Sequence, residues 1–285
     1  MAARFLAPLG KLHYDCRMQR GFSLVELSIV LVILGLLTGG ILAGQSLIRA
    51  AELRSISTDV NRFTAATQAF RDKYFSMPGD FSKATSFWGN SSTGTTGGEC
   101  ASPTTDIGTG TQTCNGNGDG YIGDGGASCH ERHRIWQHLA NAGLIEGQYS
   151  GIAGGSGVCH AVLNTNPTNS PRSRINTAGF SVASGAGTNS GHHSYFDGTY
   201  GQRFFFGGQN DALASSLWAP VIKAEEAWNI DTKMDDGRPA TGTVQTYKNG
   251  STWGSPACAT TNASATADYA LSVSDNICAL MFKFN

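Results

Sequence analysis

An uncharged apolar run near the N-terminus constrains this chain more than any other feature. Residues 27–48 carry no charge, and Glu26 is the only charged residue of the segment 22–48. A helix needs about 20 apolar residues to cross the roughly 30 Å hydrocarbon core of a bilayer, so this segment is long enough to span a membrane. Basic residues precede the run and predict that the N-terminal side stays cytoplasmic. They are Lys11, Arg17 and Arg20.

Two simpler interpretations leave part of this pattern unexplained. A secretory signal peptide has a short apolar segment and an A-x-A site after it, whereas this segment is too long and no such site follows. A plain signal anchor explains the span but leaves Glu26 without a role. A charged carboxylate inside an apolar span costs about 2.5 kcal/mol or more unless it finds a partner. We therefore expect Glu26 to have a function.

The residues around Glu26 carry a family resemblance. Gly21-Phe22-Ser23-Leu24-Val25-Glu26-Leu27 resembles the class III signal of type IV pilins and type II secretion pseudopilins. The resemblance implies that a prepilin peptidase cuts between Gly21 and Phe22 and methylates the new N-terminus at Phe22. It also implies that Glu26 pairs with the N-terminal amine of a neighbouring subunit. The partners that it implies are other pilin-like subunits, the peptidase and an inner-membrane assembly platform.

Three segments follow from this reading. Residues 1–21 are a leader, in which Met18 is a second candidate start, and residues 22–75 form one stem helix, of which 22–48 is transmembrane. Residues 76–285 form a head in the periplasm or, after filament assembly, outside. An apolar stripe of helical period predicts that the second half of the stem packs on this head. Its members are Leu47, Ala51, Ile56, Val60, Phe63, Ala66 and Phe70.

The head is predicted to be α+β with an antiparallel sheet. Helices are expected at Glu131–Ala142 and within Leu213–Asn229, where Pro220 can open a helix. Strands are expected at Val158–Leu163, Ile175–Val182, Gln202–Phe206, Thr243–Tyr247, Tyr269–Val273 and Ile277–Phe284. Three histidines fall on the first helix without metalloprotease spacing, and we expect them at the surface. They are His130, His133 and His138.

The cysteines indicate an oxidising compartment. Cys16 lies in the leader, and the six others form an even set that allows up to three disulfides. Six cysteines permit 15 pairings, so the connectivity is a hypothesis. Pairing sequence neighbours gives Cys100–Cys114, Cys129–Cys159 and Cys258–Cys278. Free buried thiols are the alternative.

A Gly-rich stretch bounded by cysteines resembles the first half of an EF-hand calcium loop. Side-chain oxygens alternate with Gly, as a hard cation that takes six to eight oxygen ligands requires. The candidate ligands are Asn115, Asn117, Asp119, the Tyr121 carbonyl and Asp124. Gly126 stands where the bidentate Glu belongs, and Asp124 or Glu131 is the candidate substitute. An Asn/Gly turn without an ion is the alternative. Asp231 and Asp235 form a second candidate cation site, although a hairpin turn is preferred there.

Charge and motifs exclude several functions. Removing residues 1–21 takes away four basic residues and one acid, so 16 basic and 20 acidic residues remain and the formal charge is −4. This balance does not favour a nucleic-acid partner. No G-x-S-x-G or P-loop motif occurs, and we expect no enzyme. The sequence predicts a structural subunit of a type IV pilus or type II pseudopilus. The alternative is a membrane-anchored exported protein that binds calcium or, like an adhesin, another ligand.

Overall fold

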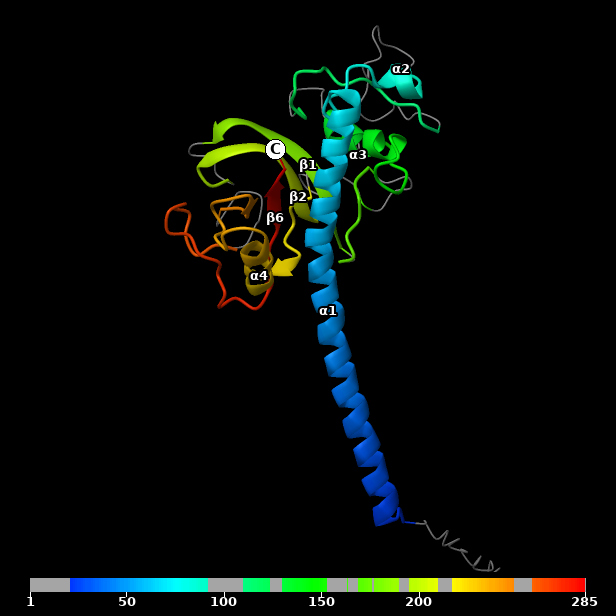
Figure 1. Ribbon diagram of the computed structural model, residues 1–285. Helices are drawn as coiled ribbons and strands as arrows, with labels where there is room; N and C mark the ends of the chain where they lie inside the picture. The colour runs from blue at the N-terminus through cyan, green and yellow to red at the C-terminus, as the bar shows by residue number, and fades with distance from the viewer. Residues whose placement is uncertain are drawn as a thin grey trace, which may run out of the picture. The chain divides into compact units, whose positions relative to one another are not determined.

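The computed structural model divides the chain into two compact units, Met1–Arg49 and Ala50–Asn285, which are described separately. The described residues are 21–91, 110–123, 130–152, 163, 169–175, 177–189, 195–209, 217–248 and 258–284. Helix α1 (Leu24–Tyr74) runs through both units (Figure 1). In the first unit this helix is all that is described beyond Gly21–Ser23.

The second unit is built on a four-stranded antiparallel sheet in the order β1-β2-β6-β4. The strands are β1 (Ala178–Asn189), β2 (Gly198–Gly208), β4 (Val244–Gln245) and β6 (Leu280–Lys283). A second, two-stranded sheet pairs β3 (Ile222–Lys223) with β5 (Asn276–Cys278). The remaining helices are α2 (Ala84–Trp88), α3 (His130–Asn141) and α4 (Ala224–Met234). The predicted α+β class with an antiparallel sheet is confirmed.

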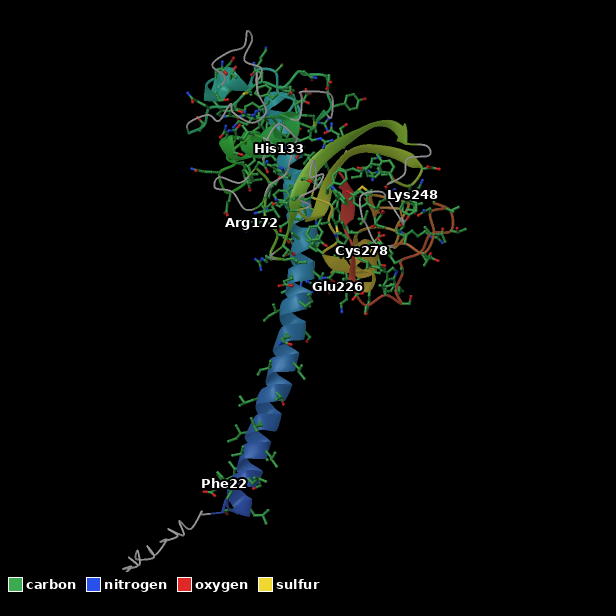
Figure 2. All side chains as sticks on the ribbon, turned by 180° about the vertical axis from the view of Figure 1, so that it is seen from behind. Phe22, His133, Arg172, Glu226, Lys248 and Cys278 are labelled. Atoms are coloured by element: carbon green, nitrogen blue, oxygen red, sulfur yellow. A yellow bond between two sulfur atoms is a disulfide. The ribbon has the colours of Figure 1, made fainter. Side chains whose placement is uncertain are left out.

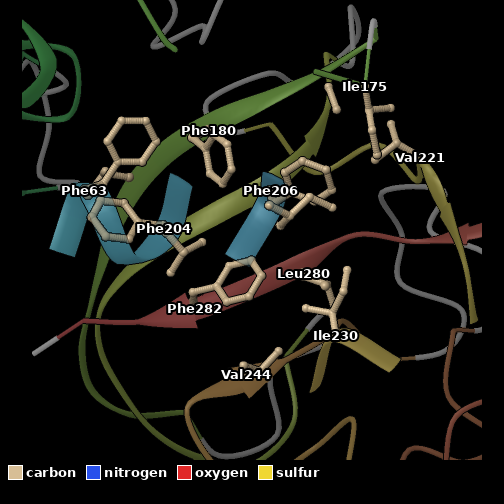
Figure 3. Close-up of a cluster of buried hydrophobic side chains, with 14 of the residues drawn as sticks. Phe63, Ile175, Phe180, Phe204, Phe206, Val221, Ile230, Val244, Leu280 and Phe282 are labelled. Carbon is tan, nitrogen blue, oxygen red and sulfur yellow. The ribbon is translucent and has the colours of Figure 1, made fainter. Parts of the chain in front are cut away.

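The apolar stripe of α1 forms the centre of the head core from Ile56 onward, whereas its first members Leu47 and Ala51 are exposed. Ile56, Val60 and Phe63 are buried, as are the later stripe members Ala66 and Phe70. The Phe63 ring lies edge-on to Trp136 of α3 at 5.0 Å and to Phe180 of β1 at 5.2 Å. Figure 3 shows Phe63 and Phe180 among the buried side chains of this core. Full burial of one such side chain stabilises the fold by about 1.5–3 kcal/mol, so this face fixes the helix on the sheet.

The register of the sheet explains why its phenylalanines reach that core. Phe180 of β1 lies opposite Phe206 of β2, and Phe204 of β2 lies opposite Phe282 of β6. Residues two apart on a strand point to the same face, so these four rings share the face toward α1. Phe205 points to the other face, where it joins a smaller buried cluster with Trp218 and Tyr247.

Helix α1 ends as the Met77-Pro78-Gly79-Asp80 sequence predicts, a few residues before the proline. Phe75 has a φ of +54°, and its N–H donates to the Arg71 carbonyl at 2.8 Å. The chain then turns under an aromatic cluster at this end of the head. The cluster comprises Tyr74, Phe81, Phe87 and Trp88.

Several predicted elements need correction. Tyr269–Val273 is a turn rather than a strand, because the Val273 N–H donates to the Ala270 carbonyl and only Tyr269 makes a bridge, to Ala259. Within Leu213–Asn229, the helix begins only at Ala224, after the short strand β3. The Glu226 carboxylate accepts the Lys223 N–H at 3.0 Å and so fixes that start. Of Val158–Leu163, only Leu163 lies within the described residues.

Candidate functional site

The N-terminal signal lies on an exposed segment directly before α1. Gly21 and Phe22 are outside the helix, and the Phe22 side chain is 87% exposed (Figure 2). A Cβ added at Gly21 would meet no atom within 4 Å. Among the described residues, none therefore covers the peptide bond that the resemblance assigns to the peptidase.

Glu26 has a local role that the sequence analysis did not include. Its carboxylate accepts the Ser23 N–H at 2.9 Å, while the Ser23 hydroxyl accepts the Val25 N–H at 3.3 Å. Ser23 thus caps the N2 N–H and Glu26, at N3, bonds back to the N-cap N–H, an arrangement close to a capping box that satisfies backbone N–H groups without helical partners. The signal S-x-x-E was visible in the sequence at 23–26. Glu26 therefore orders the helix start in addition to any role toward a neighbour.

The stem that follows is apolar on all sides. No side chain of residues 22–48 is buried within its unit. The large exposed side chains include Leu24, Leu31, Leu36, Ile41 and Leu42. Among the described residues, α1 is the one helix long and apolar enough to cross a membrane. A surface of this extent is unstable in water, so it requires lipid or other apolar helices around it.

Comparison with known families identifies this same segment. Residues 16–42 match the family model described as the prokaryotic N-terminal methylation motif. No curated protein and no solved structure matches the chain. The chain therefore carries a prepilin-type signal, of the kind found in type IV pilins and type II pseudopilins, as the sequence predicts. The motif and the apolar helix together indicate a membrane-anchored, pilin-like exported protein.

The predicted calcium loop is folded around two carboxylates from elsewhere in the chain. The Asp80 carboxylate accepts N–H groups from Gly118 at 2.6 Å and from Gly120 at 2.8 Å. The Glu131 carboxylate accepts those of Asn117 at 3.0 Å and Gly123 at 2.7 Å. The loop thus turns backbone donors inward, toward anions. Sequence analysis missed Asp80, because its partners lie about 40 residues away along the chain.

The predicted ligand side chains make turns within the same loop. The Asn117 side-chain carbonyl accepts the Asp119 N–H at 2.9 Å, and the Asp119 carboxylate accepts the Tyr121 N–H at 2.8 Å. Asn115 reaches out to accept the Thr85 N–H at 2.9 Å. These bonds describe the Asn/Gly turn that the sequence left as an alternative. Asp124 lies outside the described residues, and calcium binding stays a prediction.

Negative charge nevertheless accumulates beside this loop. Burial raises the pKa of Asp80, and the nearby charge of Asp119 raises it further, against the lowering effect of the backbone donors. The pKa of Glu131 is raised in the same way, by burial first and then by Asp80 and Asp119. A divalent cation would relieve that repulsion, so the negative charge favours calcium binding. The side-chain hydrogen bonds instead favour the turn without an ion.

A second acidic group lies at the end of α4. One carboxylate oxygen from each of Asp231, Asp235 and Asp236 lies within 4.8 Å of the other two. Asp235 accepts the Thr243 and Val244 N–H groups, and Asp236 accepts the Arg238 N–H at 2.8 Å and the Thr241 hydroxyl at 2.6 Å. These bonds organise the turns that join α4 to β4; because the segment follows a helix, it is not the hairpin turn that the sequence analysis preferred.

Two histidines expected at the surface are buried. His133 is 1% exposed and His138 is fully buried, where its Nδ1 accepts the Gly79 N–H at 3.0 Å. The proton is then on Nε2, which lies 3.1 Å from the Thr113 hydroxyl. Burial, together with the charge of Arg134, lowers the pKa of His138 to about 3. The prediction was wrong because α3 is buried on nearly all sides, so polar residues lie inside the head.

The disulfide hypothesis is confirmed at one of its three pairs. Cys258 and Cys278 are bonded, with their Cα atoms 5.0 Å apart. The bond holds the 258–278 loop to β5. Cys114 is also disulfide-bonded, while Cys100, Cys129 and Cys159 lie outside the described residues.

Proposed function

We propose that this protein is a structural subunit of a type IV pilus or a type II secretion pseudopilus. Prepilin peptidase cuts between Gly21 and Phe22 and methylates Phe22. The subunit then waits in the inner membrane with its head in the periplasm, until the assembly platform moves it into a filament. The observation that carries this proposal is the uniformly exposed apolar stem behind a prepilin-type signal. Its work is assembly rather than catalysis.

Close packing of one stem against others stabilises the proposed filament. Stem side chains such as Leu31, Leu36 and Leu42 leave lipid and pack against the stems of neighbouring subunits. Because lipid tails are as apolar as these side chains, close helix packing rather than the hydrophobic effect selects the neighbour. Gly39, Gly40 and Gly44 permit such close approach because they have no side chain. The space beside each of them is not filled by another atom of the same subunit.

Glu26 sets the register of that packing. Its partner is the methylated amine of Phe22 on a neighbouring subunit. Two unit charges 4 Å apart attract by about 4 kcal/mol at an intermediate dielectric, before desolvation is subtracted. A stem one turn too high or too low leaves both charges unpaired, so the pair selects one height.

Three substitutions separate the charge of Glu26 from its capping role. Glu26→Gln keeps an N3 side chain that can accept the Ser23 N–H but removes the charge, and Glu26→Ala removes both. Ser23→Ala weakens the cap and leaves the charge. All three chains should insert and be cut at Gly21. Immunoblots of sheared filaments should show the Ser23→Ala chain near wild-type level and neither Glu26 variant. If Glu26→Gln enters filaments as wild type does, the pairing role is wrong.

Calcium binding by the 115–123 loop is a second proposal, and it bears on the alternative of a membrane-anchored calcium- or ligand-binding protein. The mutual repulsion of Asp80, Asp119 and Glu131 supports it, because, beyond the effect of burial, Asp119 raises the pKa of Asp80 and both raise that of Glu131, and a cation would offset that effect. These three are not among the described acids whose oxygens all lie within 4.8 Å of one another. Asp80 extends the ligand set that the sequence analysis gave, in which Glu131 is already a candidate. Calcium would supply positive charge that holds the loop against the head.

A further inference from the structure

A groove lies between α1 and α4 at the end of the head where α1 enters it, and we call it the α1–α4 groove. Its volume is about 690 Å³, which is in the range of about 300–1,000 Å³ typical of ligand sites. Figure 1 shows α4 at the opposite end of the head from α2. Apolar side chains form the floor of the groove, of which Ile230 is buried and Leu53 and Met234 are partly buried. The groove therefore offers an apolar surface at the edge of the head.

The groove begins close to the end of the uncharged run along the chain. The run ends at Ile48, and the first residues of α1 that line the groove are Ala50 and Leu53. At 1.5 Å per residue, Leu53 lies about 8 Å further along the helix than Ile48. The headgroup layer of a bilayer is about 5–8 Å thick on each side of the hydrocarbon core. With residues 22–48 in a membrane, this end of the groove is therefore at the level of the lipid headgroups.

The lining of the groove changes from apolar to polar along α1. Ala50 and Leu53 come first, Arg54 follows, and Ser57 and Asn61 lie about one and two turns beyond Arg54. The spacing of three or four residues places all five on one face of the helix. A phospholipid has the same order of groups, because its acyl chains lie in the hydrocarbon core and its headgroup lies beyond them. The groove therefore matches the polarity of a lipid in the adjacent leaflet.

Two basic side chains determine the charge of the groove. Arg54 and Lys233 are exposed, and neither makes an ion pair with a described residue. Glu226 is the acid of the described lining (Figure 2), and its carboxylate accepts the Lys223 N–H at 3.0 Å. The lining thus has a net charge of +1, from two bases and one acid. A phosphodiester has a single negative charge and is the kind of anion that a guanidinium binds with two hydrogen bonds.

We propose that the α1–α4 groove binds an anionic phospholipid of the leaflet on the head side of the membrane. The phosphate lies between Arg54 and Lys233, and the first carbons of the acyl chains cover Leu53 and Met234. This inference rests on the membrane-anchored state in the proposed function and adds a lipid ligand to it. The site belongs to the unassembled subunit, because a stem that has left the bilayer takes the groove away from the lipid.

Photolabelling of the full chain in lipid vesicles tests this site. The probe is phosphatidylglycerol with a photoreactive diazirine at the start of one acyl chain, as a minor component of phosphatidylcholine vesicles. Mass spectrometry should place labels in 50–61 and 224–234 as well as in the stem, whose labelling is the internal standard for insertion. The same diazirine on phosphatidylcholine should label the stem equally. It should label the groove about tenfold less, because each basic side chain near an anionic lipid strengthens binding by about fivefold.

Paired substitutions separate this site from a general attraction of the head to an anionic surface. Arg54→Gln together with Lys233→Gln should lower the labelling of the groove by phosphatidylglycerol about tenfold and leave stem labelling unchanged. Lys73→Gln together with Lys83→Gln removes the same charge at the other end of the head and should have no effect. Ser57→Phe fills the groove and should lower its labelling although both basic residues remain. The four exchanged basic side chains are exposed, so both paired variants should melt near the wild-type temperature.

The outcomes separate this inference from the anchoring on which it rests. Equal labelling of the groove by the two lipids overturns the lipid site, as does wild-type labelling of the Arg54→Gln, Lys233→Gln chain, while a labelled stem keeps the anchor. Loss of the groove label in excess inorganic phosphate also overturns it, because the groove then recognises a free anion rather than a lipid. If neither stem nor groove is labelled, the chain does not enter the membrane, and the proposed function fails together with the lipid site.

Discussion

Asp231 makes the stability of the head depend on pH. The residue is fully buried, and its carboxylate accepts the Tyr269 hydroxyl at 2.8 Å and the Gly237 N–H at 3.2 Å. Burial raises its pKa to about 7 from an ordinary value of 3.8, with smaller contributions from Asp236 and Asp235. The folded chain therefore holds this proton more tightly than the unfolded chain. Its contribution to stability is present below about pH 4 and is lost as the pH rises to about 7.

The substitution Asp231→Asn should remove that dependence. Each unit of pKa difference between the folded and unfolded chain changes the free energy of unfolding by about 1.4 kcal/mol. Between pH 4 and pH 8, the urea midpoint of the variant should therefore fall less than that of wild type. At pH 8 the variant should be as stable as wild type or more stable. Asp268→Asn, at an exposed position, is the control and should follow wild type. Parallel curves for Asp231→Asn and wild type would show that Asp231 is not the titrating group.

At the residue scale, the sequence predicts those functions that depend on neighbours along the chain. Gly21, Phe22 and Glu26 form one local pattern, so their arrangement at the start of α1 could be read directly. Asp80 and His138 could not, because their partners come from distant segments: Gly120 for Asp80, and Gly79, 59 residues away, for His138. Burial of a carboxylate or an imidazole is a result of tertiary packing, and sequence periodicity carries little information about it.

At the scale of elements, the calcium proposal is tested on the 115–123 loop. If calcium holds the loop, chelation should lower the melting temperature of the full chain by several degrees, since an ion bound only to the folded state stabilises it by mass action. Asp119→Ala should abolish the difference between chelated and calcium-loaded protein. Asp236→Ala, in the other acidic group, should retain it. Identical melting curves with and without chelator would leave the loop as a turn held by Asp80 and Glu131.

Long, periodic elements were the ones that sequence predicted well. The stripe from Ile56 to Phe70 places α1 on the sheet, and the helix at Glu131–Ala142 corresponds to α3 within one residue at each end. The apolar run 269–273 was read wrongly as a strand, because the Cys258–Cys278 disulfide and local turns decide its conformation. Sequence also could not show why residue 116 is a glycine. A Cβ at that position would clash with the Asp80 backbone, which is distant along the chain.

At the scale of the whole molecule, an apolar anchor helix behind a prepilin-type signal continues into a disulfide-containing α+β head. The head core supports the second half of α1, while the first half keeps its apolar surface for lipid or for other stems. Under the proposed function, this division of one helix would let a subunit be stable in a membrane and later in a filament. The head keeps its own core in both states, so only the surroundings of the stem need to change.

The measurement that tests this account most directly is mass spectrometry of the N-terminal peptide from two fractions of the same cells, sheared filaments and membranes. We predict a filament chain that begins at Phe22 with one added methyl group on its amine. Cells that lack the peptidase should hold only the uncut chain, in the membrane fraction. A chain in filaments that keeps Gly21, or a processed chain that never leaves the membranes of assembly-competent cells, would contradict the account.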